Sequence, residues 1–337
     1  MESAPRRARA NSPKSNWRSV HFKLAFATFH AGAFALSSSN AVSPDFPAEL
    51  ARHLAESVRA ARRRYRKRLA RSQEKFSEKA VHELRIETRR ILALLDLLDG
   101  LHFPEPLKKV RKTFKKRLDA FDDLRDTHVQ LVLLKPLWKD FPEARPLKKH
   151  LAKCEKCLVS KLSQEINTIG SNRLNQELKR IEKSLNHSGD VPARSRSKGL
   201  AQMVLGSAFR RVVVLRRQIR RNNPSSIHRT RVAFKRFRYT AEFLQPFLPQ
   251  FTKERLARMK DFQAAAGNIQ DVAVLLSRLD KDVKSGALPA ACIKKLRAEL
   301  LRHERDAIDS FMARVDELMK FEPEHPAPFA VEPETPK

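Results

Sequence analysis

Residues 80–90 read Ala80-Val81-His82-Glu83-Leu84-Arg85-Ile86-Glu87-Thr88-Arg89-Arg90, and this stretch carries the pattern that decides the fold. On a helix turning about 100° per residue, three basic residues fall within an arc of about 60°. They are His82, Arg85 and Arg89. The opposite side carries Leu84, Ile91, Leu95 and Leu98. The segment is therefore predicted to be an amphipathic helix with one basic face and one core face.

A second segment repeats this pattern 146 residues later, as Ser226-Ile227-His228-Arg229-Thr230-Arg231-Val232-Ala233-Phe234-Lys235-Arg236. Its basic face spans an arc of about 80° and carries His228, Arg231, Lys235 and Arg238. Its core face carries Phe237, Ala241 and Leu244. Downstream, Leu124-Arg125-Asp126 parallels Ile269-Gln270-Asp271 at an offset of 145. Two repeated elements in the same order indicate an internal duplication.

Amphipathic periodicity continues on both sides of these segments, and the low glycine count of 8 disfavours tight turns and Gly-rich phosphate loops. The predicted fold class is all-α. The expected helices cover about 49–71, 79–99, 105–138, 143–169, 171–186, 198–221, 225–247, 252–280 and 288–320. A linker at 187–197, with a glycine, a proline and several serines, divides the body into halves 49–186 and 198–320. Two helical bundles that face each other are expected.

Both ends of the chain differ from the body. Residues 1–48 are predicted to be a disordered extension, and 321–337 a disordered tail rich in proline and glutamate. The apolar run Leu24–Leu36 is too short to cross a bilayer, so no membrane span is expected. With its basic lead and the small residues at 39–41, this run also resembles a secretory signal, and export is the alternative to a cytoplasmic location.

The net charge indicates the class of partner. The chain has 69 Lys+Arg against 38 Asp+Glu, a formal charge of +31. Residues 1–48 carry +4 and residues 321–337 carry −3, which leaves +30 on the body. A body this basic favours an anionic partner such as nucleic acid, polyphosphate or an acidic membrane surface. With 2 Trp and 2 Tyr, the chain offers few stacking platforms for bases.

Three cysteines, Cys154, Cys157 and Cys292, are too few for a disulfide framework and fit a reducing compartment. Cys154-x-x-Cys157, with His150 one turn earlier, has the spacing of half a zinc or redox site. Since no second Cys/His pair follows and the surroundings are predicted to be helical, two ordinary helix cysteines are the expected interpretation.

The paired helices 82–98 and 228–244, together with the downstream segments at Arg125-Asp126 and Gln270-Asp271, resemble the CHAD domain family over residues 49–320. The resemblance implies two pseudo-symmetric antiparallel bundles, each a four-helix repeat, around a central basic cavity. It also implies binding of inorganic polyphosphate, often at polyphosphate granules. The chain departs from the family pattern at Leu92, where a further basic residue is usual.

The resemblance and the basic faces together predict the binding residues. They are His82, Arg85, Arg89, Arg90, His228, Arg231, Lys235, Arg236 and Arg238, with Arg59, Arg63, Lys112, Lys115 and Arg217 from flanking basic stripes. Asp126 and Asp271 are interpreted as interhelical partners of arginines, with a catalytic role as the alternative. No Glu-x-Glu-x-Lys, Walker A, His-Glu-x-x-His or nucleophile-elbow motif occurs, so neither an enzyme nor a metal or cofactor is expected. A nucleic-acid-binding module and an enzyme acting on phosphorylated substrates are the two alternatives.

Overall fold

A computed structural model describes residues 47–103, 107–168, 171–187 and 194–324. The predictions for the extension up to residue 46, for most of the linker and for the tail from residue 325 lie outside these residues. All described helices belong to one unit, Ser43–Lys337. Within the described ranges the chain forms helices and no strand, which confirms the all-α prediction.

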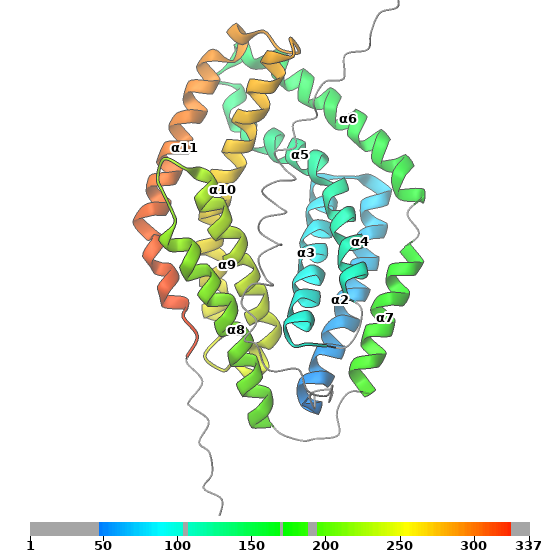
Figure 1. The fold of residues 1–337 in the computed structure, drawn as a ribbon. Helices are drawn as coiled ribbons and strands as arrows, with labels where there is room; N and C mark the ends of the chain where they lie inside the picture. Colours follow the sequence, from blue (N-terminus) through cyan, green and yellow to red (C-terminus); the bar gives the residue numbers. More distant parts are fainter. Residues whose placement is uncertain (1–46, 104–106, 169–170, 188–193, 325–337) are drawn as a thin grey trace, which may run out of the picture. The chain divides into compact units, whose positions relative to one another are not determined.

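The first half contributes α2 (Ala48–Lys75), α3 (Glu78–Gly100), α4 (Leu107–Ala120), α5 (Asp122–Leu134), α6 (Arg145–Thr168) and α7 (Ser171–His187). The second half contributes α8 (Arg194–Arg217), α9 (Pro224–Leu244), α10 (Lys253–Lys284) and α11 (Lys294–Arg314). Short 3₁₀ turns, η1 to η5, lie between or after them, at Pro136–Trp138, Pro142–Ala144, Gln245–Phe247, Ala290–Ile293 and Val315–Phe321. Figure 1 shows these helices along the chain.

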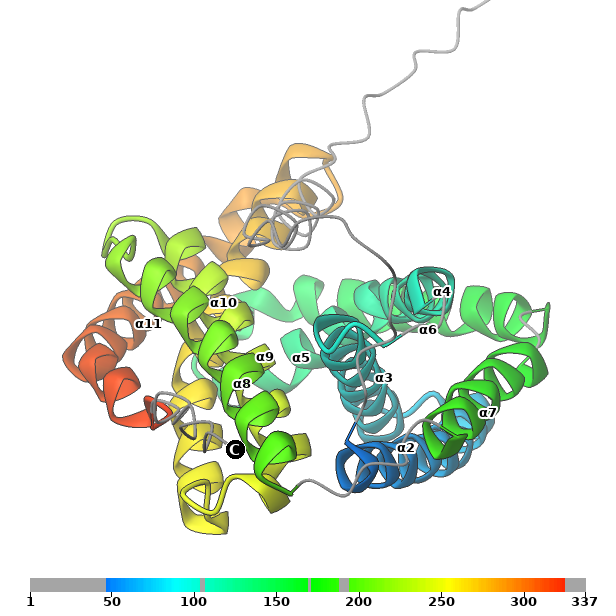
Figure 2. The ribbon, with the colours of Figure 1, turned by 60° about the horizontal axis from the view of Figure 1, so that its bottom comes forward.

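Helix packing groups these elements within each half. α2 packs against both α3 and α7, and α4 packs against α3 and α7. In the second half, α9 packs against α8 and α10, and α10 against α11. Figures 1 and 2 both show α2 running along α7 and α8 running along α9. The two basic helices, α3 and α9, also contact each other directly, so the halves meet along the elements that carry the repeated pattern.

Local sequence signals place the ends of the two basic helices. The Ser77 side chain accepts a hydrogen bond from the Ala80 amide at 3.3 Å and caps the start of α3. α9 begins at Pro224, where the missing N–H costs nothing because the first amides of a helix have no partner within it. Thr252 caps α10 through the Arg255 amide at 3.2 Å.

The single helix predicted over 105–138 is wrong. The structure breaks it at Phe121, with φ −91° and ψ 2°, into α4 and α5. The corresponding stretch of the second half lies in α10, which runs unbroken over 32 residues. The periodicity of the sequence is the same on both sides of Phe121, so it does not reveal the break.

The core faces predicted for α3 and α9 are confirmed. Leu84, Ile91, Leu95 and Leu98 are all buried, as are Phe237, Ala241 and Leu244. They belong to one large cluster that includes residues of both halves. A second, smaller cluster joins α6 to α10 and α11, with Leu147 and Leu151 packed among leucines such as Leu275 and Leu296. Both cores therefore connect the halves, and the basic faces of α3 and α9 are backed by buried side chains.

None of the described helices is both long and apolar enough to span a membrane.

Candidate functional site

Two crossed ion pairs join α3 to α9. Arg90 of α3 donates to Glu242 of α9 at 2.6 Å, and Arg236 of α9 lies 3.7 Å from Asp96 of α3. By the 146-residue offset, Arg90 corresponds to Arg236 and Asp96 to Glu242. Each helix therefore supplies the arginine of one pair and the carboxylate of the other. This exchange is what a two-fold relation between the helices produces, although the symmetry of the whole repeat stays a prediction.

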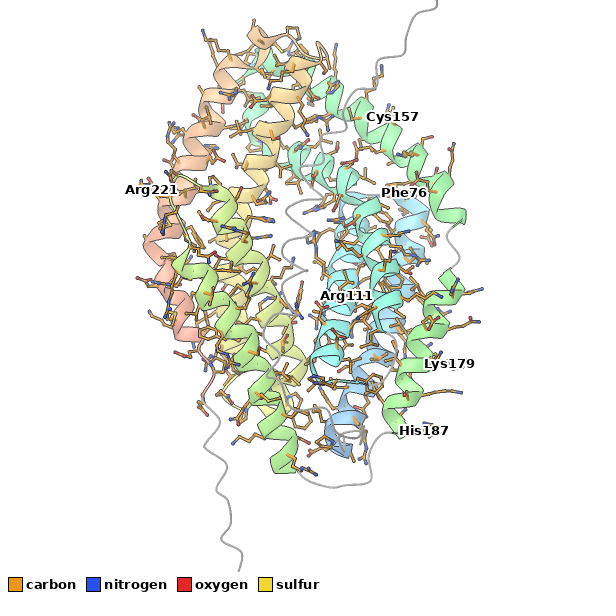
Figure 3. All side chains as sticks on the ribbon, viewed as in Figure 1. Phe76, Arg111, Cys157, Lys179, His187 and Arg221 are labelled. Carbon is orange, nitrogen blue, oxygen red and sulfur yellow. The ribbon has the colours of Figure 1, made fainter. Side chains whose placement is uncertain are left out.

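Further arginines converge on the same two carboxylates. Arg238 donates to Glu242 one turn along α9, and its Nε donates to Gln263 at 3.0 Å. Arg111 of α4, marked in Figure 3, lies 2.9 Å from Asp96. Burial raises the pKa of Asp96, and the neighbouring Arg236 and Arg111 oppose this by favouring the charged form. Arg90, Arg236 and Arg238 thus each have a carboxylate neighbour within the protein, and with Arg111 four arginines share two carboxylates.

Arg85 is held inside the first half. Its side chain is 4% exposed, and it donates to the Leu118 carbonyl at 2.6 Å and to the Asp122 carboxylate at 2.5 Å. Leu118 lies just before the break between α4 and α5, and Asp122 is the first residue of α5. The guanidinium therefore donates to a carbonyl beside the break, which also accepts from the Phe121 amide at 3.3 Å, and it pairs with the residue that starts the next helix. Its role in the structure is to fix this break.

Four other cationic side chains of α3 and α9 form what we call the central cluster: His82, Arg89, Arg231 and Lys235. Arg89 is repelled by Arg231, and Lys235 is repelled by both arginines, which places the charges of the two helices close together. All four side chains are half-buried. Within the part of the chain that the structure describes, none of them makes a hydrogen bond or a direct ion pair to a carboxylate.

The central cluster is electrostatically unbalanced. Burial, followed by repulsion from Arg85 and Arg231, lowers the pKa of Arg89 to about 10. Burial and repulsion from Arg89 and Arg231 lower the pKa of Lys235 well below its ordinary value. Burial also lowers the pKa of His82, with Arg125 adding to the effect. Each lowered pKa means that the positively charged form of the side chain is destabilised in the unliganded protein. An anion placed among these side chains would stabilise the charged form and raise the pKa again.

The surroundings of Arg231 show why the central cluster is available to bind an anion. Its guanidinium packs on Gly267 of α10, where a Cβ added to the glycine would lie 3.4 Å from Nη2. The buried Nε has no hydrogen-bond partner among the described residues. Burial lowers the pKa of Arg231, and the nearest acidic influence that opposes it is Asp271. Burial raises the pKa of Asp271, against the pull of Arg231 and Arg125. Asp271 is thus an interhelical neighbour of Arg231, in line with the sequence interpretation.

The remaining predicted binding residues lie on other elements. Arg59 donates to Glu182 of α7 at 2.6 Å, and Arg63 lines a groove of about 510 Å³ between α2 and α7. Lys112 and Arg217 are exposed on α4 and at the end of α8. Lys115 favours the charged form of Asp119, as Arg85 does, and so lies near the α4–α5 break. His228 is half-buried on α9. The basic stripe of α2 is therefore turned toward α7, which the sequence did not predict.

No group of three or more His, Cys, Asp or Glu side chains in the described ranges is arranged to hold a metal ion.

Comparison with known proteins places this architecture. The family model described as "CHAD domain" matches residues 2–135 and 71–280, the second match alone covering more than half of the chain. The chain belongs to the CHAD domain family. The crystal structure of the CHAD domain from the plant Ricinus communis is similar to this CHAD domain with a TM-score of 0.65 at 20% sequence identity. The alignment covers 85% of this chain and 97% of that one, and at this identity it supports the fold alone. No curated protein matches the sequence.

Sequence reasoning on this CHAD domain missed four residues that decide which cations are available. Asp96 and Glu242 pair with arginines across the α3–α9 contact, and Asp122 pairs with Arg85. Gly267 has no side chain that could pair with Arg231, which makes no direct ion pair in the described ranges. A signal for the first two was present, because Asp96 and Glu242 recur at the same 146-residue offset as the basic residues. Acidic residues that recur in both halves of a basic repeat predict internal pairing.

Proposed function

We propose that this CHAD domain binds inorganic polyphosphate at the central cluster, without catalysing a reaction on it. The observation that carries the proposal is the convergence of Arg89 with Arg231 and Lys235, none of which has a direct carboxylate partner in the described ranges. Such a concentration of like charge is costly in the unliganded protein. A polyanion compensates for this cost, so the arrangement supports binding.

The chemistry of the cluster suits phosphate oxygens. Guanidinium groups donate to them in a planar, bidentate geometry, and Lys235 adds a compact charge. His82 gains affinity for a proton beside an anion, and so adds positive charge where its pKa is now lowered. With four cations engaged, the logarithm of the affinity should fall with the logarithm of salt with a slope of about −3, from about 0.7 per neutralised phosphate of a single chain.

A narrow polyanion fits the placement better than a duplex. Packed helices lie about 8–10 Å apart, and α3 and α9 are in contact, so the cations of both helices gather along one strip. The phosphates of duplex DNA are separated by grooves of about 6 and 12 Å, and they need a broader basic surface. Nucleic acid remains the alternative ligand.

The absence of catalysis and a cytoplasmic location at polyphosphate granules are parts of the same proposal. The absence of catalysis rests on the lack of the catalytic motifs named above, and the location rests on the family resemblance.

The test is competition binding at two or more salt concentrations. Labelled polyphosphate is bound to the full chain, and unlabelled polyphosphate, single-stranded RNA and duplex DNA compete at equal phosphate concentration. We expect polyphosphate to compete at least tenfold better than either nucleic acid. Equal or better competition by duplex DNA would overturn the proposal in favour of a nucleic-acid-binding module. Release of phosphate from polyphosphate or from nucleoside triphosphates, lost in a Lys235→Gln variant, would replace it with an enzyme.

A further inference from the structure

The Cys154-x-x-Cys157 pair lies on α6, and the structure surrounds one of its two thiols with polar groups. Nη2 of Arg278 on α10 donates to the Cys154 sulfur at 3.1 Å. Nε2 of His150, one turn earlier on α6, lies 3.6 Å from the same sulfur. Cys154 is half-buried, and Cys157, which is labelled on α6 in Figure 3, is exposed. This thiol thus has two nitrogen neighbours, one of them a permanent cation.

Asp282 holds both neighbours in place. Its carboxylate accepts from Nε of Arg278 at 2.7 and 3.0 Å, and it lies 3.3 Å from Nε2 of His150. Burial lowers the pKa of Arg278, but Asp282 and then the Cys154 sulfur outweigh burial and raise it. The guanidinium therefore stays charged and oriented toward the sulfur. Four side chains from two helices make this arrangement, which we call the Cys154 cluster: His150, Cys154, Arg278 and Asp282.

We propose that Cys154 is a peroxide-reactive thiol and that Cys157 is its resolving partner. A sulfur that receives a hydrogen bond from a guanidinium has its negative form stabilised, and the thiolate is the form that attacks an oxidant. The sulfur of Cys154 attacks the terminal oxygen of a hydroperoxide, so that an S–O bond forms as the O–O bond breaks. The leaving alkoxide or hydroxide takes the proton lost by the thiol, which gives an alcohol or water and Cys154 sulfenic acid.

The second step uses Cys157. Its sulfur attacks the sulfenic sulfur, an S–S bond forms, the S–O bond breaks, and hydroxide leaves as water with the proton of the Cys157 thiol. In total, one hydroperoxide and two thiols give one disulfide, one alcohol or water from the first step, and one water from the second. Cα atoms three residues apart on a helix are about 5 Å apart, which lies within the range of about 4.4–6.8 Å that disulfides span.

Formation of this disulfide changes a contact between the halves. The sulfur of Cys154 must turn from Arg278 on α10 toward Cys157 on its own helix, so the α6–α10 hydrogen bond ends. Arg278 and His150 retain their contacts with the Asp282 carboxylate, and the buried leucines of the second cluster still pack between α6 and α10. The modification site is separate from the central cluster, and it does not depend on the ligand proposed for that cluster.

Cys292 provides an internal control in the same chain. Its sulfur donates to the Pro289 carbonyl at 3.0 Å, and burial raises its pKa. Both features favour the neutral thiol, which is the unreactive form. The rate of oxidation of Cys154 can therefore be divided by that of Cys292 in the same sample, and this ratio does not depend on protein concentration or oxidant dose.

The experiment treats the reduced full-length chain with an equimolar amount of hydrogen peroxide and follows each cysteine by peptide mass spectrometry. In wild type we expect a Cys154–Cys157 disulfide. In a Cys157→Ser variant with dimedone present, we expect the sulfenic-acid adduct at Cys154, at least tenfold faster than at Cys292. Arg278→Gln should slow the oxidation of Cys154 on the order of tenfold, because it removes a charge-assisted hydrogen bond to the sulfur. Arg278→Lys keeps a positive charge and should restore much of this oxidation rate.

Equal rates at Cys154 and Cys292 in wild type would overturn the proposal, as would an unchanged rate in Arg278→Gln with helix content retained. If Arg278→Gln loses helix content, the wild-type ratio and the dimedone adduct of Cys157→Ser decide the matter alone. Disulfides that link two chains, in place of the one within α6, would also contradict the role of Cys157.

Discussion

Arg85 and Arg231 occupy equivalent positions of the two basic helices and have opposite surroundings. Arg85 is 4% exposed and is paired with Asp122 and the Leu118 carbonyl, at a break between two helices. Arg231 is half-buried, lies against Gly267 of an unbroken helix, and makes no direct ion pair to a carboxylate in the described ranges. By the 145-residue offset, Gly267 is the counterpart of Asp122. The first half thus has an aspartate, Asp122, where the second half has a glycine, Gly267. This difference accompanies a structural role for Arg85 and leaves Arg231 available to a ligand.

The two halves also differ in how many arginines and lysines they offer to a ligand. The sequence points to Arg238, which has Leu92 as its counterpart in the first half. Arg238, however, is buried and paired with Glu242 and Gln263. The second half supplies Arg231 and Lys235 to the central cluster, whereas Arg89 is the available arginine of the first half. Stronger binding by the second half is therefore expected, from Arg231 and Lys235 and not from Arg238.

The largest expected effect is on binding, when Arg231 and Lys235 are both replaced by alanine. Each contact of a cation with phosphate contributes about 1.5–3 kcal/mol, so affinity for polyphosphate should fall by at least about 100-fold. The salt slope should become shallower by about 1.4. Titration at two salt concentrations measures both quantities.

The matched control is Lys112→Ala with Arg217→Ala, which removes the same charge from two exposed positions outside the central cluster. This control should change affinity by only a few-fold. An equal loss in the control would mean that net charge, and not the placement of the cluster, determines binding.

The next effect concerns stability. Arg85→Ala leaves the buried Leu118 carbonyl without its side-chain donor and leaves Asp122 unpaired, so the free energy of unfolding should fall by about 2 kcal/mol. Arg231→Ala removes a repelled cation and should leave this free energy equal or higher. Thermal and urea unfolding of both variants test the difference. A larger loss of stability in Arg231→Ala than in Arg85→Ala would contradict the assigned roles.

A smaller effect is expected from Gly267→Asp, which gives the second half the carboxylate that the first half has. The new carboxylate should neutralise Arg231 and lower polyphosphate affinity about tenfold, equivalent to about 1.4 kcal/mol. Gly267→Ala is the control. It adds a Cβ at van der Waals distance from a flexible side chain and removes a helix glycine, which should raise stability by about 0.5–1 kcal/mol with little change in affinity. Equal affinity in both variants would show that Arg231 does not contact the ligand.

The smallest effect is a dependence on pH in the range below about 10.4, the pKa of an exposed lysine. Because the pKa of Lys235 is lowered, this residue loses its proton at a lower pH than an exposed lysine, whose pKa is about 10.4. A bound anion favours the charged form, so binding takes up a proton in this window, and affinity should fall several-fold as pH rises. In the unliganded protein the sign is opposite, since stability rises as Lys235 is neutralised.

An arginine holds its proton to a higher pH than a lysine in the same place, so Lys235→Arg should move the fall in affinity to higher pH. Calorimetry in buffers of different ionisation enthalpy measures the proton uptake directly. Identical profiles for wild type and Lys235→Arg would show that Lys235 does not titrate in this window.

Helix positions and core faces were predictable from the sequence because they depend on local periodicity. Leu84 and Ile91 in α3, and Phe237 and Ala241 in α9, were predicted to be buried and are buried. The break at Phe121 was not predictable, since the side chain that stabilises it, Arg85, comes from another helix 33 residues before Leu118. Local patterns do not encode such contacts.

The composition of the site was predicted only in part for the same reason. A basic residue on a helical face looks the same in sequence whether it is neutralised or available. Arg90 and Arg89 are adjacent, yet Arg90 is paired with Glu242, 152 residues away, while Arg89 is not paired within the described ranges. Which arginine remains available depends on tertiary contacts with acidic residues.

The crossed pairs Arg90–Glu242 and Arg236–Asp96 have a kinetic consequence. They hold α3 against α9 whether or not an anion is present, so capture of a polymer requires no closure of the helices. Association should therefore be governed by electrostatic steering and diffusion, and its rate should fall steeply with ionic strength. A longer polymer offers more equivalent segments for rebinding after one segment dissociates. Increasing the polymer length should therefore mainly lengthen the residence time of the complex.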